Sequence, residues 1–468
     1  MAVSEGIFRI VDCLTLPLGQ AVPCAAMSTN MTRRRFGLAA LATAIASPLD
    51  ATAQAAAVAK GRSDPQSWRA LFPALDQRVG GKPLVYLDSA ATTQRALPVL
   101  DEIMDFYRHD NANPGGALHE LARRANERYE NARRTLATFI NAATPAEVVW
   151  TRGTTEGINL VATAWGRSQL RRGDEVLLTI AEHASNLLPW RLAAEATGAR
   201  VRFVEVDDEG RISLDDLDRK LSERTKLVAF SHVSNVAGYI NPAAEICARA
   251  RRAGARVFID AAQSAPHVAL DVQAIGCDFL AFSSHKMMGP MGVGVLWART
   301  EVLEEMPPYQ AGSNMAHEVD VEGQAFEHGA RKFGAGTPNV SGPLGLAAAV
   351  RWMQSLGRGD IERHEADLTG HALDRLTAVP GLKLIGPRSP GQRIPVFSFT
   401  LAATAPQEVL RQLDAQGIAI RAGDLSALPL LKSCGVTVAA RASCYLYTSR
   451  NEIDQLADAL LRISAGTK

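Results

Sequence analysis

Short apolar runs alternate with amphipathic segments along this chain from about Pro65 onward. The clearest runs are EVLLTIA, KLVAFSHV, RVFIDAAQ and DFLAFSSH. Between two of them, AAEICARARRAGA places apolar and basic residues on opposite faces and ends at a glycine, which is typical of a crossover helix. This alternation predicts an α/β fold with a mostly parallel sheet covered by helices.

The pattern changes after about Pro343. Helical spacing dominates RWMQSLGRGDIERHEADLTGHALDRLTAV, and the apolar runs GLKLIG and VFSFTLA are short. A second, smaller α+β domain fits this pattern. We therefore expect an N-terminal arm over residues 61–83, a large domain over residues 84–343 and a small C-terminal domain over residues 344–468.

The balance of charges limits the classes of partner. The 468 residues include 50 Lys and Arg against 49 Asp and Glu, a net charge of +1, so no overall field attracts nucleic acid or an anionic membrane. The six cysteines lack the C-x-x-C spacing of zinc sites and disulfide frameworks, so we expect no metal. Cys277, in the apolar stretch IGCDFLAF, is expected to be a small buried hydrophobe. The balanced charge makes a small-molecule substrate a better expectation than nucleic acid or an anionic membrane.

The first 60 residues have the layout of an export signal. Three arginines at 33–35 precede an apolar run at 36–46 and the small-residue motif Ala-Thr-Ala at 51–53. The order Thr-Arg-Arg-Arg-Phe matches the twin-arginine type, and the apolar run is too short to span a bilayer. We expect export to the periplasm by the twin-arginine pathway, without stable membrane association. A disordered basic tail and an uncleaved anchor are the alternatives, and the start codon could be Met27 or Met31.

Polar residues that follow the apolar runs are the candidates for chemistry, because ligands of open α/β sheets bind beyond the carboxyl ends of the strands. Lys286 follows DFLAFSSH, and a desolvated lysine can lose its proton and attack an aldehyde. Asp260 ends RVFID, where a carboxylate can keep a pyridine nitrogen protonated. A snorkelling surface lysine and a strand-end cap are the plain alternatives. Gln263, His183 and Asn235 lie at or just after strand ends as well.

A phosphate site is predicted where a helix begins. Thr154 and Thr155 follow the apolar run EVVW and precede an apolar-periodic segment, so their hydroxyls and free backbone N–H groups suit a phosphate. Ser283 and His285, beside Lys286, could donate further hydrogen bonds. An ordinary helix N-cap is the alternative for the two threonines.

Taken together, these motifs resemble the class V aminotransferase family, and especially its cysteine desulfurase and selenocysteine lyase branch. The resemblance extends from about Leu84 to the C-terminus. The stretches that carry it are YLDSAATTQ, TRGTTEGINLVATAWG, AEHASNLLPW, SHVSNVAGYINP, IDAAQSAPH, FSSHKMMGPMGVGVLW, EEMPPY, FGAGTPN and RASCYLYTS.

The resemblance implies a fold type I enzyme that uses pyridoxal 5'-phosphate (PLP), and it gives each matching residue a role. Lys286 would be the Schiff-base lysine, Asp260 the pyridinium partner and His183 the ring-stacking residue, with Lys286 or His183 as the catalytic base. The cofactor-binding set would be Thr154, Thr155, His183, Asn235, Asp260, Gln263, Ser283, His285 and Lys286. Thr337 would reach the phosphate from a neighbouring subunit, so a homodimer is expected.

An amino acid is the substrate that the resemblance implies. Arg441 matches the arginine that pairs with the α-carboxylate, a contact that suits guanidinium geometry. Its alternative role is an ion pair between domains. Asn235, Arg421 and His119 are the other candidates for substrate binding, although NANPGGALH keeps only His119 of the basic loop found in desulfurases.

The chain departs from the desulfurases at one decisive position. Those enzymes carry a nucleophilic cysteine in a loop of the form R-x-G-x-x-C-A-x-P-L, whereas this chain reads RAGDLSALPL, with Ser426 at that place. A hydroxyl is a far poorer nucleophile toward sulfur than a thiolate, and Ser426 is also suited to cap a helix. Cys434 should lie at the far end of that helix, and Cys444 should face either the pocket or the core.

Three functional hypotheses follow. The first is a PLP enzyme that acts on an amino acid without a persulfide cysteine, by β-elimination, transamination, racemisation or decarboxylation. The second is a cysteine desulfurase or selenocysteine lyase that releases sulfur or selenium and alanine. The third is a non-catalytic binding protein on the fold of a PLP enzyme.

Overall fold

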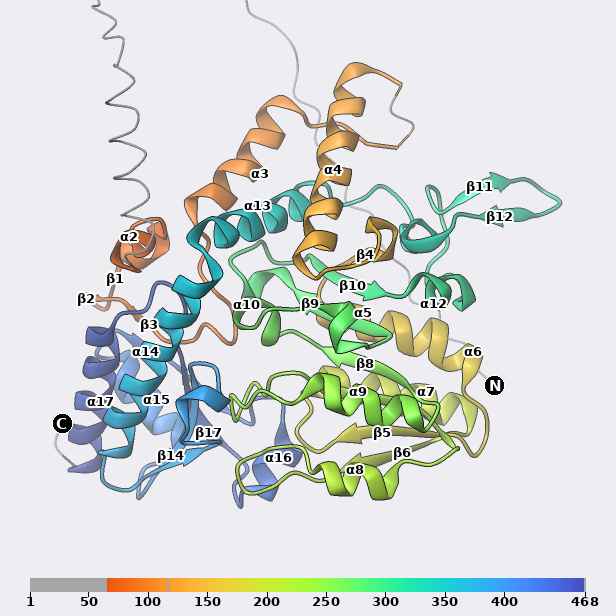
Figure 1. The fold of residues 1–468 in the computed structure, drawn as a ribbon. Coiled ribbons are helices and arrows are strands. Elements are labelled where there is room, and N and C mark those ends of the chain that lie inside the picture. Colours follow the sequence, from red (N-terminus) through yellow and green to blue (C-terminus); the bar gives the residue numbers. More distant parts are fainter. Residues whose placement is uncertain (1–64, 116–117, 467–468) are drawn as a thin grey trace, which may run out of the picture. The chain divides into compact units, whose positions relative to one another are not determined.

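The apolar runs of the sequence form a seven-stranded sheet (Figure 1). The computed structural model describes residues 65–115 and 118–466, so the expected export signal lies outside the described residues. In chain order the strands are β4 (Val148–Thr151), β5 (Glu175–Thr179), β6 (Arg200–Val204), β7 (Thr225–Ser231), β8 (Arg256–Asp260), β9 (Phe279–Ser283) and β10 (Gly294–Ala298).

Their order across the sheet is β4-β10-β9-β8-β7-β5-β6. Only β10 pairs antiparallel with its neighbours, β4 and β9, while the pairs from β9 through β8, β7 and β5 to β6 are parallel. The predicted α/β fold with a mostly parallel sheet is therefore confirmed.

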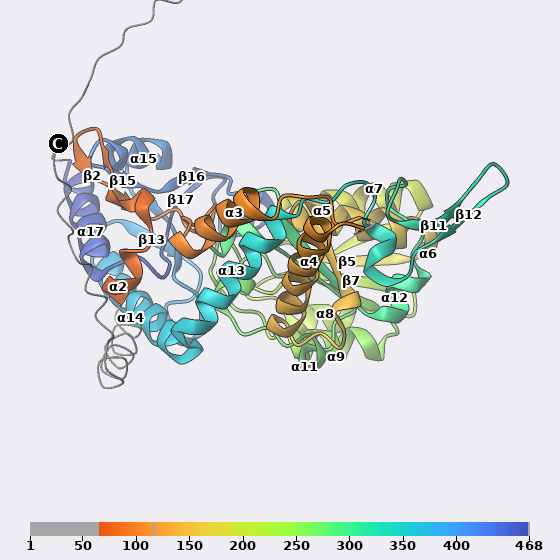
Figure 2. The same cartoon turned by 90° about the horizontal axis from the view of Figure 1, so that it is seen from above.

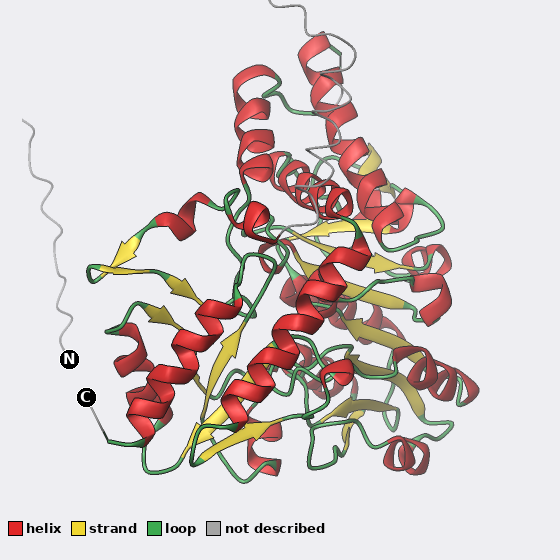
Figure 3. Ribbon diagram, turned by 60° about the vertical axis from the view of Figure 1, so that its left-hand side comes forward, coloured by secondary structure: helices red, strands yellow, loops and turns green. Residues whose placement is uncertain are grey.

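Both faces of this sheet are buried, which explains why its strands are continuously apolar. Along β7, Val228 and Phe230 join one hydrophobic cluster, and Leu227 and Ala229 join another, because successive side chains point to opposite faces. The main helices of this part are α4 (Glu120–Phe139), α5 (Thr154–Val161), α7 (Leu188–Thr197), α8 (Leu214–Lys220) and α9 (Ala243–Arg252). Figure 3 shows helices in front of and behind the strands. Cys277 is fully buried, as predicted.

The C-terminal part contains a separate antiparallel sheet. Its strands are β13 (Leu382–Ile385), β14 (Val396–Leu401), β16 (Arg421–Gly423) and β17 (Ala439–Ser443), in the order β13-β14-β17-β16. The helices α14 (Arg358–Thr377), α15 (Pro406–Asp414) and α17 (Arg450–Ser464) accompany them and share a third hydrophobic cluster. The expected boundary after residue 343 falls within α13 (Ser341–Leu356), a helix that packs against α3 (Leu97–His109) and α4, and the boundary stays a prediction.

Contacts between an N-terminal segment and the C-terminal part of the chain matter for the site. The short strand β3 (Val85–Tyr86) pairs in parallel with β15 (Ile418–Ala419), and Asp88 forms an isolated bridge with Ser443. In Figure 2 the orange N-terminal elements accordingly lie beside the blue C-terminal ones. The segment after residue 84 thus contacts the small sheet before the chain enters the large one.

The remaining elements are short. They are α2 (Pro65–Arg69), β1 (Arg78–Val79), β2 (Lys82–Pro83), α6 (Arg167–Gln169), α10 (Ser264–His267), α11 (Val272–Ile275), α12 (Thr300–Glu305), β11 (Ala316–Val319), β12 (Gln324–Phe326) and α16 (Leu428–Ser433). Within residues 65–115 and 118–466, no helix has both the length and the apolar character needed to cross a bilayer.

Candidate active site

A cavity of about 380 Å³ lies where the strands β7, β8 and β9 end. The start of α5, the residues after β5, and the strands β16 and β17 complete its walls. Most of the predicted site residues line this one cavity: Thr154, Thr155, His183, Asn235, Asp260, Gln263, Ser283, His285, Lys286, Arg421 and Arg441. The topology therefore brings together side chains that are up to 287 positions apart in the sequence, from Thr154 to Arg441.

Lys286 ends a 3-10 turn that directly follows β9. Burial lowers the pKa of its amine to about 8, and the nearby Arg441 and Arg421 act in the same direction, against the effect of Asp260. The turn is held in place because the Thr93 N–H donates to the His285 carbonyl at 2.9 Å. At pH 7 roughly a tenth of such amines are neutral, far more than for a solvated lysine, and the neutral form is the nucleophile.

Asp260 ends β8, and its side chain is buried beside Lys286. Burial raises the pKa of its carboxyl, while the Ala262 N–H, which donates to Oδ1 at 2.9 Å, and the charge of Lys286 oppose that shift. Among the described residues, no hydrogen bond reaches the second oxygen, Oδ2. A protonated ring nitrogen in the cavity would satisfy this buried carboxylate.

His183 follows β5 and caps a short 3-10 turn, with its Nδ1 accepting from the Ser185 N–H at 3.1 Å. Burial, followed by the charges of Lys286 and Arg441, lowers the pKa of His183 to about 4. Its ring is therefore neutral, with Nδ1 as the acceptor and the proton on Nε2. Such a ring can lie on an aromatic cofactor and exchange a proton.

The resemblance implies that Gln263 donates a hydrogen bond to the ring oxygen. Its Nε2 donates to the Ala90 carbonyl at 2.8 Å, so one of the two amide hydrogens is already used. Its buried Oε1 has no partner among the described residues. This oxygen can accept a hydrogen bond from a ring hydroxyl, so Gln263 still fits a hydroxypyridine.

The first turn of α5 brings together the residues of the predicted phosphate site, which stays a prediction. The Thr154 N–H donates to the Ser283 Oγ at 2.8 Å, and the two hydroxyls are 2.7 Å apart. The Thr155 hydroxyl is 2.9 Å from that of Ser185, and His285 lies beside them with a pKa that burial lowers to about 4. These hydroxyls and the helix N-terminus suit a phosphate. The donors of the cavity therefore fit PLP, and the residues that the structure describes contain no cluster suited to a metal ion.

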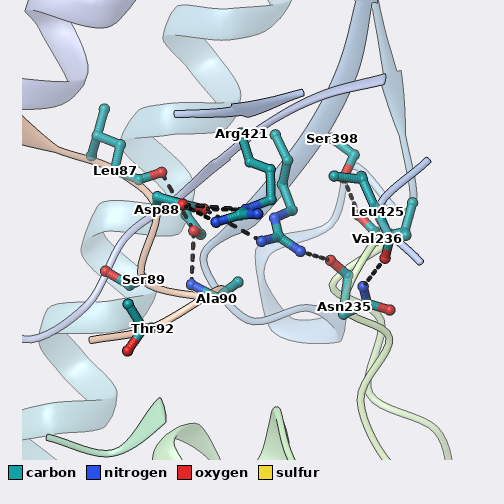
Figure 4. A network of polar contacts seen from close by, with 12 residues as sticks. Leu87, Asp88, Ser89, Ala90, Thr92, Asn235, Val236, Ser398, Arg421 and Leu425 are labelled. Carbon is teal, nitrogen blue, oxygen red and sulfur yellow. Dashed lines mark hydrogen bonds and ion pairs between the residues drawn. The ribbon is translucent and has the colours of Figure 1, made fainter. Parts of the chain in front are cut away.

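Two arginines also line the cavity, Arg421 and Arg441, and Figure 4 shows Arg421 beside Asp88. Arg441 is 3% exposed, and burial lowers the pKa of its guanidinium to about 10. Its Nη1 donates to the Asn235 carbonyl at 3.1 Å, its Nη2 lies 3.4 Å from Asp88, and its buried Nε has no partner among the described residues. Arg441 therefore has donors left for a substrate carboxylate. The ion pair with Asp88 also joins two distant parts of the chain, and both predicted roles of Arg441 stay predictions.

The loop after β16 carries Ser426. Leu425 and Ser426 have φ values of 52° and 54°, a left-handed conformation that costs a non-glycine residue about 1–3 kcal/mol. The N-cap of α16 is Ala427, so Ser426 does not cap this helix. Instead, the Ser426 carbonyl accepts from the Ala184 N–H at 2.7 Å, and Ser426 lines the cavity.

No thiol lines this cavity among the described residues. Cys434 is the C-cap of α16, at the far end of the helix, as predicted. Cys444 is buried in the hydrophobic cluster of the small sheet, and burial raises the pKa of its thiol well above the usual range. Of the two orientations expected for Cys444, the structure has the one that faces the core.

Two predicted residues lie elsewhere. His119 is exposed and caps α4 by accepting the Ala122 N–H at 3.3 Å. Thr337 lines a second cavity, beside β4 and the hairpin of β11 and β12. Neither residue lines the cavity around Lys286. For Thr337 this agrees with the expected action from a neighbouring subunit, which stays a prediction.

Three polar residues of this region were missed in the sequence. Asp88 forms ion pairs with Arg421 and Arg441. Asp424 lines the cavity, and Glu182 is fully buried next to His183. Glu182 accepts from Asn186 and Ser231, each at 2.7 Å, while burial raises its pKa to about 7. Asp88 had a usable signal, because it follows the apolar pair of β3 within YLDSAATTQ.

Known proteins resemble this chain over most of its length. The family model described as aminotransferase class-V matches residues 85–456. A probable cysteine desulfurase of Halalkalibacterium halodurans is 45% identical over 390 residues, which cover 83% of this chain and 95% of the relative. A cysteine desulfurase of Synechococcus elongatus is 43% identical over 85% of this chain, and only 63% of that longer relative is covered.

Solved structures share the fold. The cysteine desulfurase CsdA from Escherichia coli has a TM-score of 0.80 and 36% identity, covering 86% of this chain and 99% of its own. A complex between the cystine C–S lyase C-DES and its reaction product cysteine persulfide has a TM-score of 0.72 and 25% identity, covering 83% of this chain and 99% of its own.

Proposed function

Since this chain belongs to the class V aminotransferase family and is a PLP-dependent enzyme, we propose that it cleaves the bond between the β-carbon and the sulfur or selenium of a cysteine-like amino acid. The observation that carries the proposal is the grouping of Lys286, Asp260, His183 and Arg441 around one cavity, in a chain 45% identical to a probable cysteine desulfurase. The hypothesis of a non-catalytic binding protein has no support from these relatives.

Each group of residues in the cavity has a separate role in the proposed reaction. When bound, PLP withdraws electrons from the α-carbon of an amino acid. Asp260 supplies the carboxylate for the ring nitrogen, and the first turn of α5 holds the phosphate. Arg441 binds the α-carboxylate of the substrate, which orients the α-hydrogen toward a base.

Two groups are suited to move that proton. The Lys286 amine, with its pKa near 8, can accept a proton at neutral pH and return it. The neutral His183 ring, with its pKa near 4, offers a second acceptor. We assign the α-proton to Lys286, because its pKa lies closer to the pH at which the reaction would run.

The fate of the sulfur is the finer part of the proposal. Because no thiol lines the cavity among the described residues, we propose that the sulfur passes to an acceptor outside the chain. The relatives named cysteine desulfurases favour alanine as the product. The balanced reaction is then cysteine and a thiol RSH giving alanine and the persulfide RSSH, and selenocysteine reacts in the same way.

β-Elimination is a second candidate. In this route cysteine and water give pyruvate, ammonia and hydrogen sulfide. Ser426, at the position where the resemblance implies a cysteine, favours it, since this route needs no sulfur nucleophile. The likeness to a cystine C–S lyase adds support.

Product analysis separates the routes. Protein loaded with PLP is incubated with cysteine or selenocysteine, with and without a small thiol, and alanine, pyruvate and sulfide are measured. Alanine that depends on the added thiol supports the desulfurase route, and pyruvate with sulfide supports elimination. Formation of neither product from either substrate refutes the proposal, and Lys286→Ala is the negative control.

We also propose a homodimer and export to the periplasm. Thr337, outside the cavity of its own chain, supports the homodimer, and residues 33–53 support export. A monomeric mass in light scattering would contradict the homodimer. An uncleaved protein confined to the cytoplasmic fraction would contradict export.

A further inference from the structure

Two arginines face each other beside the cavity. Arg421 on β16 and Arg441 on β17 are direct partners in the antiparallel register of these strands. Like charges placed opposite each other in a sheet repel. Arg441 is 3% exposed and the Arg421 side chain is 49% exposed, so water screens this pair only from the Arg421 side.

Asp88 contacts both guanidinium groups, and Figure 4 shows it beside Arg421. Its Oδ2 accepts from Arg421 Nη2 at 2.8 Å, both carboxylate oxygens are 3.2 Å from Arg421 Nε, and its Oδ1 is 3.4 Å from Arg441 Nη2. The Asp88 side chain is 13% exposed, so this carboxylate is shielded from water. Asp88 comes from the segment after β3, far from both arginines in the sequence.

The contacts continue from Arg441 to the loop. Arg441 Nη1 donates to the Asn235 carbonyl at 3.1 Å, and the Asn235 side chain donates to the Leu425 carbonyl at 2.9 Å. Leu425 lies in the loop directly after β16, the strand that carries Arg421, so the contacts close into a ring through Arg421, Asp88, Arg441, Asn235 and Leu425. Leu425 and its neighbour Ser426 keep left-handed backbone conformations within this ring.

We propose that Asp88 is a positioning residue. It holds the carboxylate-binding Arg441 and the segment 421–426, which is β16 and the loop after it, in a fixed position relative to each other. The part of the cavity wall that carries Ser426 then keeps a fixed position relative to Arg441, the residue that binds the α-carboxylate. Asp88 itself does not line the cavity. The inference rests on the proposed function only in so far as Arg441 binds an amino acid, and its first test does not depend on any reaction.

That test is hydrogen–deuterium exchange of residues 421–427 in the protein without cofactor. Asp88→Asn keeps the shape of the side chain and removes its charge, so the two arginines repel each other and the ring opens. We expect amide exchange in this loop to rise at least roughly tenfold, while exchange in β7 and β8 is unchanged. Unchanged loop exchange in Asp88→Asn would overturn the proposal.

The second test concerns binding. In the PLP-loaded enzyme, Asp88→Asn should raise KM for the amino acid roughly tenfold or more and alter kcat much less, because Arg441 is misplaced while Lys286 is not. A fall in KM would show that Asp88 only competes with the substrate for Arg441, and the proposal would be wrong. Asp88→Glu should restore part of the loss, which a purely structural role does not predict.

Two further variants complete the design. If Asp88→Asn does not fold, Arg421→Gln opens the same ring from its exposed side, since the Arg421 side chain is 49% exposed. Asp367→Asn, which removes an exposed ion pair with Arg450 away from the cavity, is the matched control and should leave loop exchange and KM unchanged. If the wild-type protein is itself inactive on sulfur amino acids but the exchange pattern is as expected, the proposed function fails and the role of Asp88 stands.

Discussion

At the scale of single residues, chemistry depends on where burial changes a pKa. Lys286 and His183 both have their pKa lowered, chiefly by burial, and each thereby becomes neutral in a pH range where a solvated lysine would be charged or a solvated histidine would be partly charged. Asp260 shifts in the other direction, again chiefly through burial. Their positions at strand ends were enough to predict these residues as candidates. The size and the sign of their pKa shifts depend on the surrounding residues.

The pKa of Lys286 predicts how cofactor attachment depends on pH. Only the neutral amine reacts with an aldehyde, so its attachment rate should rise with pH and level off above about 8. A lysine with an ordinary pKa would level off only near 10.5. The measurement is the growth of visible absorbance after PLP is added to cofactor-free protein at several pH values.

Lys286→Ala should show no growth of this absorbance at any pH. Attachment in wild-type protein that keeps rising up to pH 10 would contradict the assigned pKa.

Ser426 gives a second prediction at this scale. Its hydroxyl is a poor nucleophile toward sulfur, so Ser426→Ala should keep kcat within about threefold of wild type. A loss of a hundredfold or more would assign the hydroxyl a direct part in the reaction. Steady-state kinetics with cysteine measures this, and the melting temperature of each variant controls for misfolding.

At the scale of elements, close backbone packing shapes the phosphate site. Gly294 begins β10, and a Cβ added there would lie 2.6 Å from both the Gly153 Cα and the Phe282 carbonyl oxygen. Gly153 directly precedes α5, where the phosphate-binding turn starts. The packing of β10 against this turn therefore sets where the N-terminus of α5 lies.

Gly294→Ala should push β10 away from that turn and weaken cofactor binding. We expect a loss of roughly 1–3 kcal/mol in the free energy of unfolding and a higher Kd for PLP. The matched control is Gly370→Ala, within α14, where an added Cβ meets nothing within 4 Å. The control should be as stable as wild type or more stable, by about 0.5–1 kcal/mol. Equal Kd values for PLP in Gly294→Ala and wild type would contradict this account.

At the scale of the whole molecule, the cavity is assembled from both sheets. The region around the large sheet supplies Asp260 and Lys286, the small sheet supplies Arg421 and Arg441, and the segment after β3 supplies Ala90 and Ala91. A ligand that contacts all of these parts should hold them together, so binding is linked to the stability of the folded chain.

Removal of the cofactor should therefore lower the melting temperature. With free PLP about a hundredfold above its Kd, the added stability is about 2.7 kcal/mol. Scanning calorimetry of the same protein with and without PLP checks this, and Lys286→Ala should gain less from PLP than wild type. An identical melting temperature in the two states would show that PLP does not bridge these parts.

The sequence by itself determined the α/β architecture, because strands buried on both faces must be continuously apolar and crossover helices must be amphipathic. It also predicted Lys286, Asp260 and His183 near one another, since the ends of parallel strands meet at one edge of a sheet, whereas Arg441 was predicted from the resemblance. The position of Cys434 at the far end of α16 was also predicted from the sequence of that helix.

Only the tertiary structure decided the rest, because these features depend on contacts between distant segments. Asp88 joins Arg421 and Arg441 through the pairing of β3 with β15, which no local periodicity encodes. The orientation of Cys444 toward the core and the left-handed backbone at Ser426 likewise arise from packing in the small sheet and from the contact with Ala184. Lys286 was identifiable from the residues before it, but its lowered pKa exists only once the two sheets enclose it.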